Sequence, residues 1–168
     1  MQENLNYRCY SLQMQNWLDY LDIENKYNNQ EIKKKCLLFI FLWLRYNEYY
    51  NSKISRNIGD FQKALQLSEC EICKEKYNEF KEQFHTSFKQ IDGADSPRTW
   101  ILDIKNNRKI YYNSSSSLKD FLTVIYKIRC NIFHGDKPPN NTNIKIIAWG
   151  YDCFNQLLNE CNYWNTGI

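Results

Sequence analysis

The segment from Gln30 to Asn51 most strongly constrains the fold, because it lacks glycine and proline and contains an unbroken apolar run, CLLFIFLWL, at 36–44. Polar residues at 28–31 precede the run, as is typical of the start of a helix. The run is far shorter than the roughly 20 apolar residues that span a bilayer. The segment therefore predicts one long helix that is buried in a protein core.

Composition favours a helical core built from large side chains. Of the 168 residues, 43% are hydrophobic and 16% are aromatic, whereas only 5 are glycine and 3 are proline. This apolar content excludes intrinsic disorder, and the scarcity of turn-forming residues argues against a loop-rich β-sandwich. We therefore expect a single all-α domain over 1–168, a helical bundle of about four to five core helices.

Helical periodicity predicts further helices on both sides of this segment. An N-terminal helix or extension is expected within 1–28, where Leu12, Trp17, Leu18 and Leu21 recur. Strong helix formers and regularly spaced aromatic residues predict a second long helical region from Asp60 to about Gln90. A final helix is expected over 142–162, with one apolar stripe made of Ile144, Ile147, Ala148, Tyr151, Phe154, Leu158 and Cys161.

An insert precedes the fourth helix. Residues 92–117 contain glycine, proline and a run of four serines, and in them TWILDI and KIYY flank KNNR, which fits either a small hairpin or a surface loop. The helical pattern returns after Ser117, which forms a shortened capping box with Asp120. We expect this helix to occupy 118–134, because Gly135 suits a C-terminal cap and the following prolines cannot continue a helix.

Charge and cysteine usage bear on the class of protein. The net charge of +3, from 22 basic and 19 acidic residues, neither indicates nor excludes nucleic-acid binding. The 7 cysteines lack the spacing of a disulfide framework, and the opening sequence MQENLNYRCY lacks the apolar core of a signal peptide. Cys70 and Cys73 form a lone C-x-x-C without a second ligand pair. We therefore expect a cytoplasmic protein with no membrane association, no metal and no other cofactor.

The fourth helix carries the most informative residues. Leu118, Phe121, Leu122, Ile125 and Ile132 form its apolar stripe, and Arg129 projects into the middle of that stripe. His134 follows near the helix end, where carbonyl dipoles favour a protonated imidazole. A guanidinium that binds phosphoryl oxygens and an imidazole that moves a proton together suit phosphate chemistry.

A purely structural interpretation stays open at this point. A buried guanidinium needs either a carboxylate partner or an anion in a cleft, and Arg129 satisfies this need equally well by pairing with a core carboxylate. His134 can likewise serve as a helix-terminal residue that donates hydrogen bonds to the last carbonyls.

The surroundings of these residues resemble the HEPN domains, whose signature is Arg, four to six residues, then His near the end of a core helix. The string VIYKIRCNIFHGDK at 124–137 is similar to the R-N-N-L-F-H-G-G-K pattern of the Apea-like branch. The string FIFLWLRYNEYYN at 39–51 resembles the L-W-x-x-F-N-x-x-Y helix of the same branch. Together with the low-complexity insert before the fourth helix and the closing helix, the resemblance covers most of residues 30–160.

The resemblance implies a helical bundle that dimerises around a shared cleft and a metal-independent endoribonuclease. In such enzymes the RNA 2′-hydroxyl attacks the neighbouring phosphate, which leaves a 2′,3′-cyclic phosphate. On this basis Arg129 and His134 are the expected catalytic residues. Asn131, Lys137 and Asn47 are the expected substrate-binding residues.

The resemblance further implies a toxin, abortive-infection or antiviral defence component that acts on tRNA or mRNA, with an antitoxin or defence-system protein as partner. One alternative is a catalytically inactive HEPN module that binds RNA, a nucleotide or a partner protein, because Cys130 replaces the polar residue that usually follows the Arg. Another alternative is a helical interaction protein in which Arg129 forms only an ion pair. Asp136 stands where members regulated by adenylylation carry tyrosine, which argues against that regulation.

Overall fold

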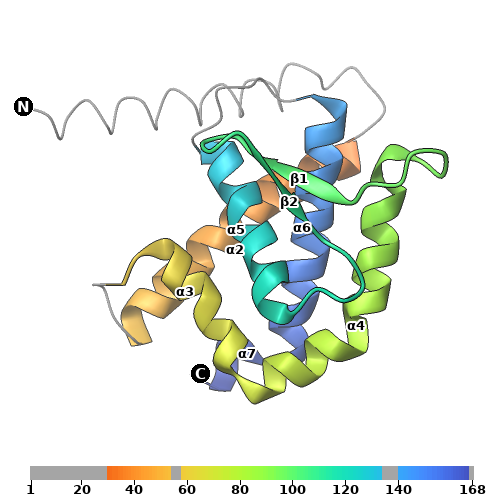
Figure 1. Cartoon of the computed structure of the whole chain (residues 1–168). Helices are drawn as coiled ribbons and strands as arrows, with labels where there is room; N and C mark the ends of the chain where they lie inside the picture. Colours follow the sequence, from red (N-terminus) through yellow and green to blue (C-terminus); the bar gives the residue numbers. More distant parts are fainter. Residues whose placement is uncertain (1–29, 54–57, 134–139, 167–168) are drawn as a thin grey trace, which may run out of the picture.

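Helix α6 (Asn141–Glu160) lies at the centre of the computed structural model, which describes residues 30–53, 58–133 and 140–166 (Figure 1). It packs against α2 (Gln30–Lys53), α4 (Glu71–Lys89) and α5 (Leu118–Phe133). Gly150 permits the close approach, because a Cβ added there would lie 3.1 Å from Cδ1 of Ile128 on α5 and 3.4 Å from Cε2 of Phe39 on α2. The predicted, mostly helical class is confirmed.

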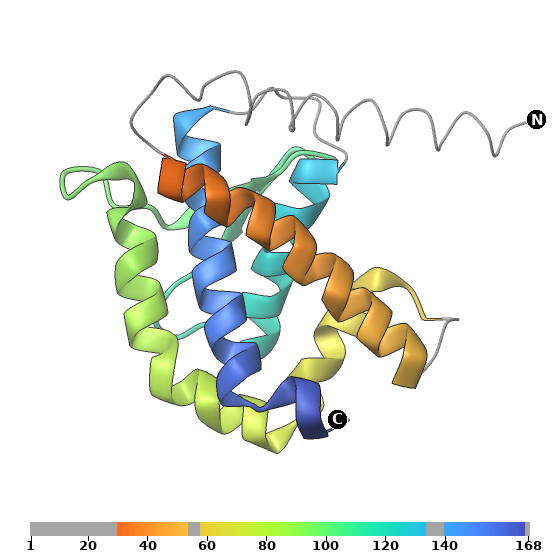
Figure 2. The same ribbon diagram turned by 180° about the vertical axis from the view of Figure 1, so that it is seen from behind.

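Helix α2 is the long helix expected from the glycine-free segment. Seen from behind, it crosses α6 and α5 diagonally (Figure 2). One side of it is deeply buried, through Cys36, Phe39, Trp43, Tyr46 and Tyr50. The opposite side leaves Phe41 and Leu44 exposed. The apolar run is thus wider than the face that the bundle covers.

The expected long helical region from Asp60 to Gln90 is interrupted at Cys70. Helix α3 (Asp60–Gln66) continues into a short 3-10 helix (Leu67–Glu69), and Cys70 is extended with φ −77° and ψ 120° before α4 begins. The interruption lets α3 pack against α5 while α4 packs against α6. Propensity alone did not predict it, because tertiary packing overrides a run of helix formers.

The insert between α4 and α5 contains a hairpin and not an irregular loop. Strands β1 (Trp100–Asp103) and β2 (Arg108–Tyr111) are antiparallel, with Trp100 opposite Tyr111. Asn107 has a φ of 48°, which the turn requires and which asparagine tolerates better than most residues. The hairpin lies across the adjacent ends of α5 and α6 (Figure 1).

The start of α5 has the predicted cap. The Ser117 amide donates to Asp120 Oδ2 at 2.8 Å, and the Asp120 amide donates to Ser117 Oγ at 3.2 Å. The helix then buries the whole predicted apolar stripe, and Ile132 is the last buried residue. The cap therefore fixes the register in which Arg129 reaches the core side of the helix.

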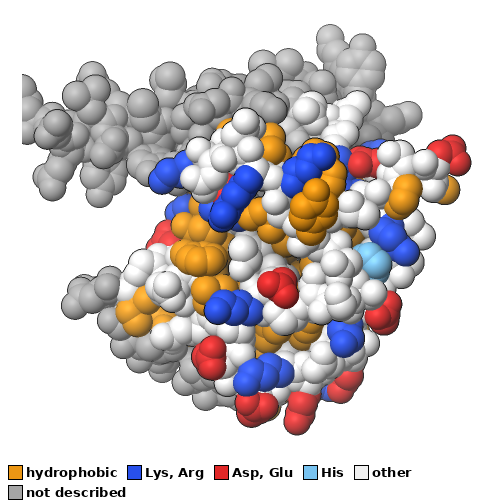
Figure 3. All heavy atoms as spheres, in the orientation of Figure 1, with side chains coloured by type: hydrophobic (Ala, Val, Ile, Leu, Met, Phe, Trp, Pro, Cys, Tyr) orange, Lys and Arg blue, Asp and Glu red, His pale blue; other side chains and the backbone are white. Residues whose placement is uncertain are grey.

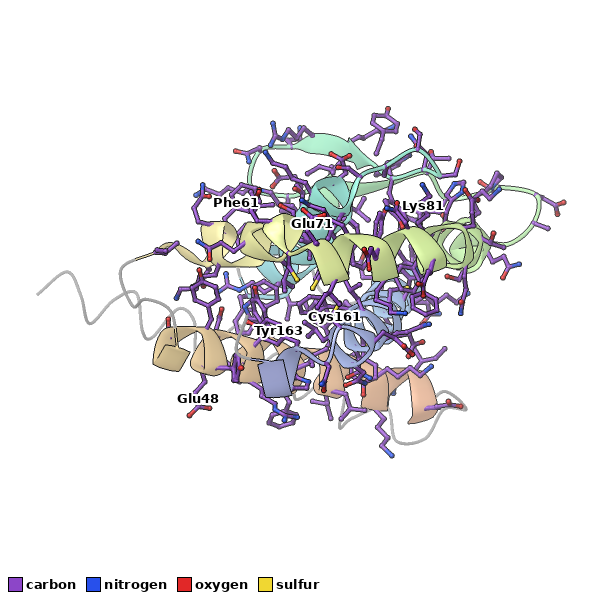
Figure 4. The ribbon with its side chains drawn as sticks, turned by 90° about the horizontal axis from the view of Figure 1, so that it is seen from below. Glu48, Phe61, Glu71, Lys81, Cys161 and Tyr163 are labelled. Atoms are coloured by element: carbon purple, nitrogen blue, oxygen red, sulfur yellow. The ribbon has the colours of Figure 1, made fainter. Side chains whose placement is uncertain are left out.

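Aromatic side chains fill the space between these helices. Phe121 is fully buried, and its ring centroid lies 5.4 Å from those of both Tyr77 and Phe84. Beyond the end of α6, Cys161 and Tyr163 lie between α4 and α2 (Figure 4). Tyr163 belongs to the short α7 (Tyr163–Thr166).

Some expectations fall on residues outside the described ranges. These are the N-terminal helix within 1–28, the end of the fourth helix at His134, and the turn from Gly135 that follows it. Within the described ranges, no helix combines the length and the apolar character that a membrane crossing requires.

Candidate functional site

The side chain of Arg129 projects from α5 into the space between α2 and α3. Its side chain is 16% exposed. Its Cζ is 4.9 Å from the ring centroid of Phe133, 5.9 Å from that of Trp43 and 6.0 Å from that of Tyr126. Aromatic faces attract cations, so these rings stabilise the guanidinium in a largely dry environment.

The carboxylate partner of Arg129 is Asp60, the first residue of α3. Arg129 Nη2 donates to Asp60 Oδ2 at 2.9 Å, and Lys63 Nζ lies 3.6 Å from Asp60 Oδ1. The ion pair that the structural interpretation required is therefore present. The three side chains nevertheless hold two positive charges and one negative charge. The cluster is electropositive and partly open to solvent, since Asp60 is 34% exposed.

Several buried polar atoms of Arg129 and of α2 have no hydrogen-bond partner among the described residues. They include Arg129 Nε, Trp43 Nε1 and Asn47 Oδ1. Asn47 lies one helical turn beyond Trp43 on α2, and it is only half buried. Unsatisfied buried donors and acceptors cost free energy in the folded protein.

Asn131 does not face Arg129. Its Nδ2 donates to the Leu102 carbonyl at 2.5 Å, and its Oδ1 accepts from the Ile104 amide at 3.3 Å. Two residues along a helix correspond to a rotation of about 200°, so Asn131 projects from the opposite side of α5. The structure thus gives Asn131 an additional role that the sequence did not predict, because it fixes the hairpin to the motif helix.

Cys130 contacts its helix neighbour Tyr126. Arg129 Nη1 donates to Cys130 Sγ at 4.0 Å. Burial, and to a smaller extent the Cys130 thiol, raises the pKa of Tyr126 to about 12. The phenol is therefore neutral at physiological pH and can act as a hydrogen-bond donor. Both residues line a hollow of about 190 Å³ between α5 and the hairpin turn, together with Lys105 and Lys127.

His134 and Lys137 lie outside the described residues. The last described residue of α5 is Phe133, whose ring is the nearest of the three to the Arg129 guanidinium. Three of the five expected site residues are therefore described. Arg129 faces α2, the helix that carries Asn47. The side chain of Asn131 points away from both, toward the hairpin.

Asp60 and Lys63 were not predicted from the sequence as site residues. Asp60 is an acidic residue in the first turn of a short helix, a position at which carboxylates are common for helix-dipole reasons alone. Its partner lies 69 positions away. No local pattern could therefore have marked it.

The described residues contain no group of three or more side chains suited to holding a metal ion. Cys70 and Cys73 instead belong to a small thiol cluster with Cys161, in which Cys73 is hydrogen-bonded to both of the others. The interaction with Cys161, followed by burial, raises the pKa of Cys73 above its usual value. Cys73 therefore stays protonated in the core.

Comparison of the chain with protein-family models, with curated proteins and with solved structures found no match.

A second charged cluster joins the hairpin to α5. The Asp103 carboxylate is 1% exposed, and its Oδ2 lies 2.9 Å from Lys127 Nζ, 2.8 Å from Asn106 Nδ2 and 3.4 Å from Arg108 Nε. Burial by itself raises the pKa of Asp103, but the hydrogen bonds from Asn106 and Lys127 outweigh it and hold the pKa below its usual value. The carboxylate is therefore charged at neutral pH.

Asp103→Ala is expected to lower the free energy of unfolding at pH 7 by about 2 kcal/mol, because Lys127 loses its partner. The pKa of Asp103 is lower in the folded protein than in the unfolded chain, so its contribution is complete above about pH 4 and disappears as the pH falls through the folded pKa. Urea unfolding at pH 7 and pH 3 measures the difference, with Asp95→Ala in the exposed loop before β1 as the control. An equal loss at both pH values would contradict the prediction.

Proposed function

We propose that this protein is a HEPN-type, metal-independent endoribonuclease. The observation that carries the proposal is the electropositive cluster around Arg129, on the core helix whose next residues complete the Arg and His motif. A partly open site with an excess positive charge and unsatisfied polar atoms fits the phosphate of an RNA backbone. The wider proposal is a toxin, abortive-infection or antiviral defence component that cleaves tRNA or mRNA in the cytoplasm.

The proposed reaction is an internal phosphoryl transfer. The O2′ of one ribose attacks the adjacent phosphorus, so that an O2′–P bond forms and the P–O5′ bond breaks. His134 takes the proton of the 2′-hydroxyl or delivers a proton to the departing O5′, and two copies of the site in a homodimer would supply both functions. Arg129 stabilises the negative charge that develops on the phosphoryl oxygens. The products are a 2′,3′-cyclic phosphate and a 5′-hydroxyl, and no water is consumed.

Two other functions have an observation in their favour. Cys130 lies one helical turn from Tyr126 and offers an RNA only a weak donor, which favours an inactive HEPN module that binds RNA, a nucleotide or a partner protein. In such a module Arg129→Ala would weaken binding although no cleavage occurs. The ion pair between Arg129 and Asp60 favours a helical interaction protein, in which changes at His134 would have little effect.

The test compares the purified wild-type protein with His134→Ala on total cellular RNA in EDTA. We expect discrete fragments that end in 2′,3′-cyclic phosphate from the wild type, and a rate about a thousandfold lower from the variant. Circular dichroism of both proteins checks that the fold is intact. Absence of cleavage by both proteins would contradict the enzyme and favour the binding module. Equal cleavage by both proteins would mean that His134 takes no part in the reaction.

A further inference from the structure

A cavity of about 320 Å³ lies between β1 and the adjacent ends of α5 and α6. Its size falls at the lower end of the range of about 300–1,000 Å³ that is usual for small-molecule sites. The apolar part of its lining comes from both helices, through Ile128, Ile132, Ile146 and Ile147, and from the hairpin, through Trp100, Ile101, Leu102 and Ile104. Polar side chains complete the lining, through Arg98, Asn131, Asn140, Thr142 and Asn143. A ligand that fits has apolar faces and polar edges.

The described lining of this cavity holds one charged side chain, a cation whose charge is balanced by a carboxylate outside the lining. Arg98 is the one charged side chain among the described lining residues, none of which is Asp or Glu. Arg98 is 12% exposed and pairs with Asp92 at 2.7 Å, outside the lining. Its Nε is buried and has no hydrogen-bond partner among the described residues. An anionic group would supply the acceptor that this donor lacks.

The outer face of the hairpin next to the cavity is aromatic and basic. Tyr111 is 60% exposed and stands opposite Trp100, and Lys109 Nζ lies 4.4 Å from the centroid of the Trp100 ring. Figure 3 shows basic and hydrophobic side chains close together over this region. Basic side chains that alternate with aromatic rings are the usual surface for single-stranded nucleic acid, whose bases stack and whose phosphates pair with cations.

The cavity is held at a fixed position relative to the motif helix. Asn131 lines it and also bonds to the backbone at Leu102 and Ile104, and Ile132 of the same helical turn forms part of its floor. A strand of RNA that enters the cavity therefore lies beside the last turn of α5. From there, the chain of nucleotides can extend toward the end of the helix.

We infer that this cavity binds one nucleotide of single-stranded RNA, with its base against the four isoleucines of α5 and α6 and its phosphate at Arg98. The asparagine and threonine side chains then contact the polar edge of the base. This inference rests on the proposed function, because it assigns a substrate subsite to a protein that acts on RNA.

The test measures the affinity of a labelled, mixed-sequence single-stranded RNA of about twelve nucleotides by fluorescence anisotropy, in the His134→Ala protein. Arg98→Gln removes the cation, and Thr142→Phe fills the cavity from its rim. Arg45→Gln is the matched control, since Arg45 Cζ also lies over a tryptophan, at 4.2 Å from the Trp164 ring. We expect about tenfold weaker binding for each cavity variant and no change for the control.

Three outcomes would overturn the inference. If the wild type cleaves RNA and both cavity variants, with unchanged melting temperatures, bind like the control, the subsite is wrong and the proposed function stands. If the protein neither binds nor cleaves RNA, both fail. If nuclear magnetic resonance titration shows that AMP or UMP binds in an Arg98-dependent manner while the RNA does not bind, the cavity serves a free nucleotide.

Discussion

Arg129→Ala is expected to reduce the rate of RNA cleavage by about a thousandfold, because in the proposed reaction the Arg129 guanidinium stabilises the negative charge that develops on the phosphoryl oxygens. The same change removes the partner of Asp60 and the ring contacts. We therefore also expect a decrease of about 2 kcal/mol in the free energy of unfolding. Initial cleavage rates at saturating RNA and urea unfolding measure the two effects separately.

Asp60→Asn distinguishes a catalytic Arg129 from a purely structural one. This variant removes the ion pair but leaves the guanidinium between the aromatic rings, so its loss of stability should be smaller than that of Arg129→Ala while most of the activity remains. Arg129→Lys keeps the charge and loses the planar fork, and we expect intermediate activity. If cleavage falls to the same extent in Asp60→Asn and Arg129→Ala, Arg129 acts only by holding the helices together.

Phe121→Ala is expected to lower the free energy of unfolding by about 4 kcal/mol, the largest stability effect that we predict. The side chain is fully buried at the centre of the aromatic core, where its ring contacts Tyr77 and Phe84 as well as Tyr112 and Trp149. Its removal leaves a cavity that these rigid rings cannot fill. Urea unfolding followed by far-ultraviolet circular dichroism measures the change.

Phe41→Ala is the matched control for this prediction. It deletes the same atoms from a ring that is 64% exposed on the outer side of α2, and we expect a change within about 0.5 kcal/mol. A similar loss for both variants would mean that the outer side of α2 is covered in solution. A loss below about 1 kcal/mol for Phe121→Ala would contradict the assigned core.

The helices could be predicted where local chemistry determines them. The start of α5 was predictable because Ser117 and Asp120 satisfy its first amides themselves, and α2 was predictable because no residue in it can end a helix. The interruption at Cys70 could not be predicted, because it arises from the packing of α3 against α5 and of α4 against α6. The hairpin stayed ambiguous because its turn depends on Asn107 adopting a positive φ, which the sequence permits but does not require.

Of the ion pair at the candidate site, only Arg129 could be predicted from the sequence. An arginine on an apolar stripe must have a partner, and this requirement holds whatever the fold. The identity of that partner depends on how α3 lies against α5, and the hairpin-anchoring role of Asn131 depends on where the insert folds back. Both are long-range contacts, so they follow from the packing of whole elements and not from any spacing in the sequence.

The hydrogen bonds of Asn131 also affect how the motif helix opens. The final turn of a helix usually frays first, because its carbonyls have no partners within the helix. Here that turn is held from two opposite sides, by Asp60 through Arg129 and by the hairpin backbone through Asn131. Fraying would have to break tertiary contacts to two separate elements. The end of α5 should therefore exchange its amide protons together with the core, although it is the end of a helix.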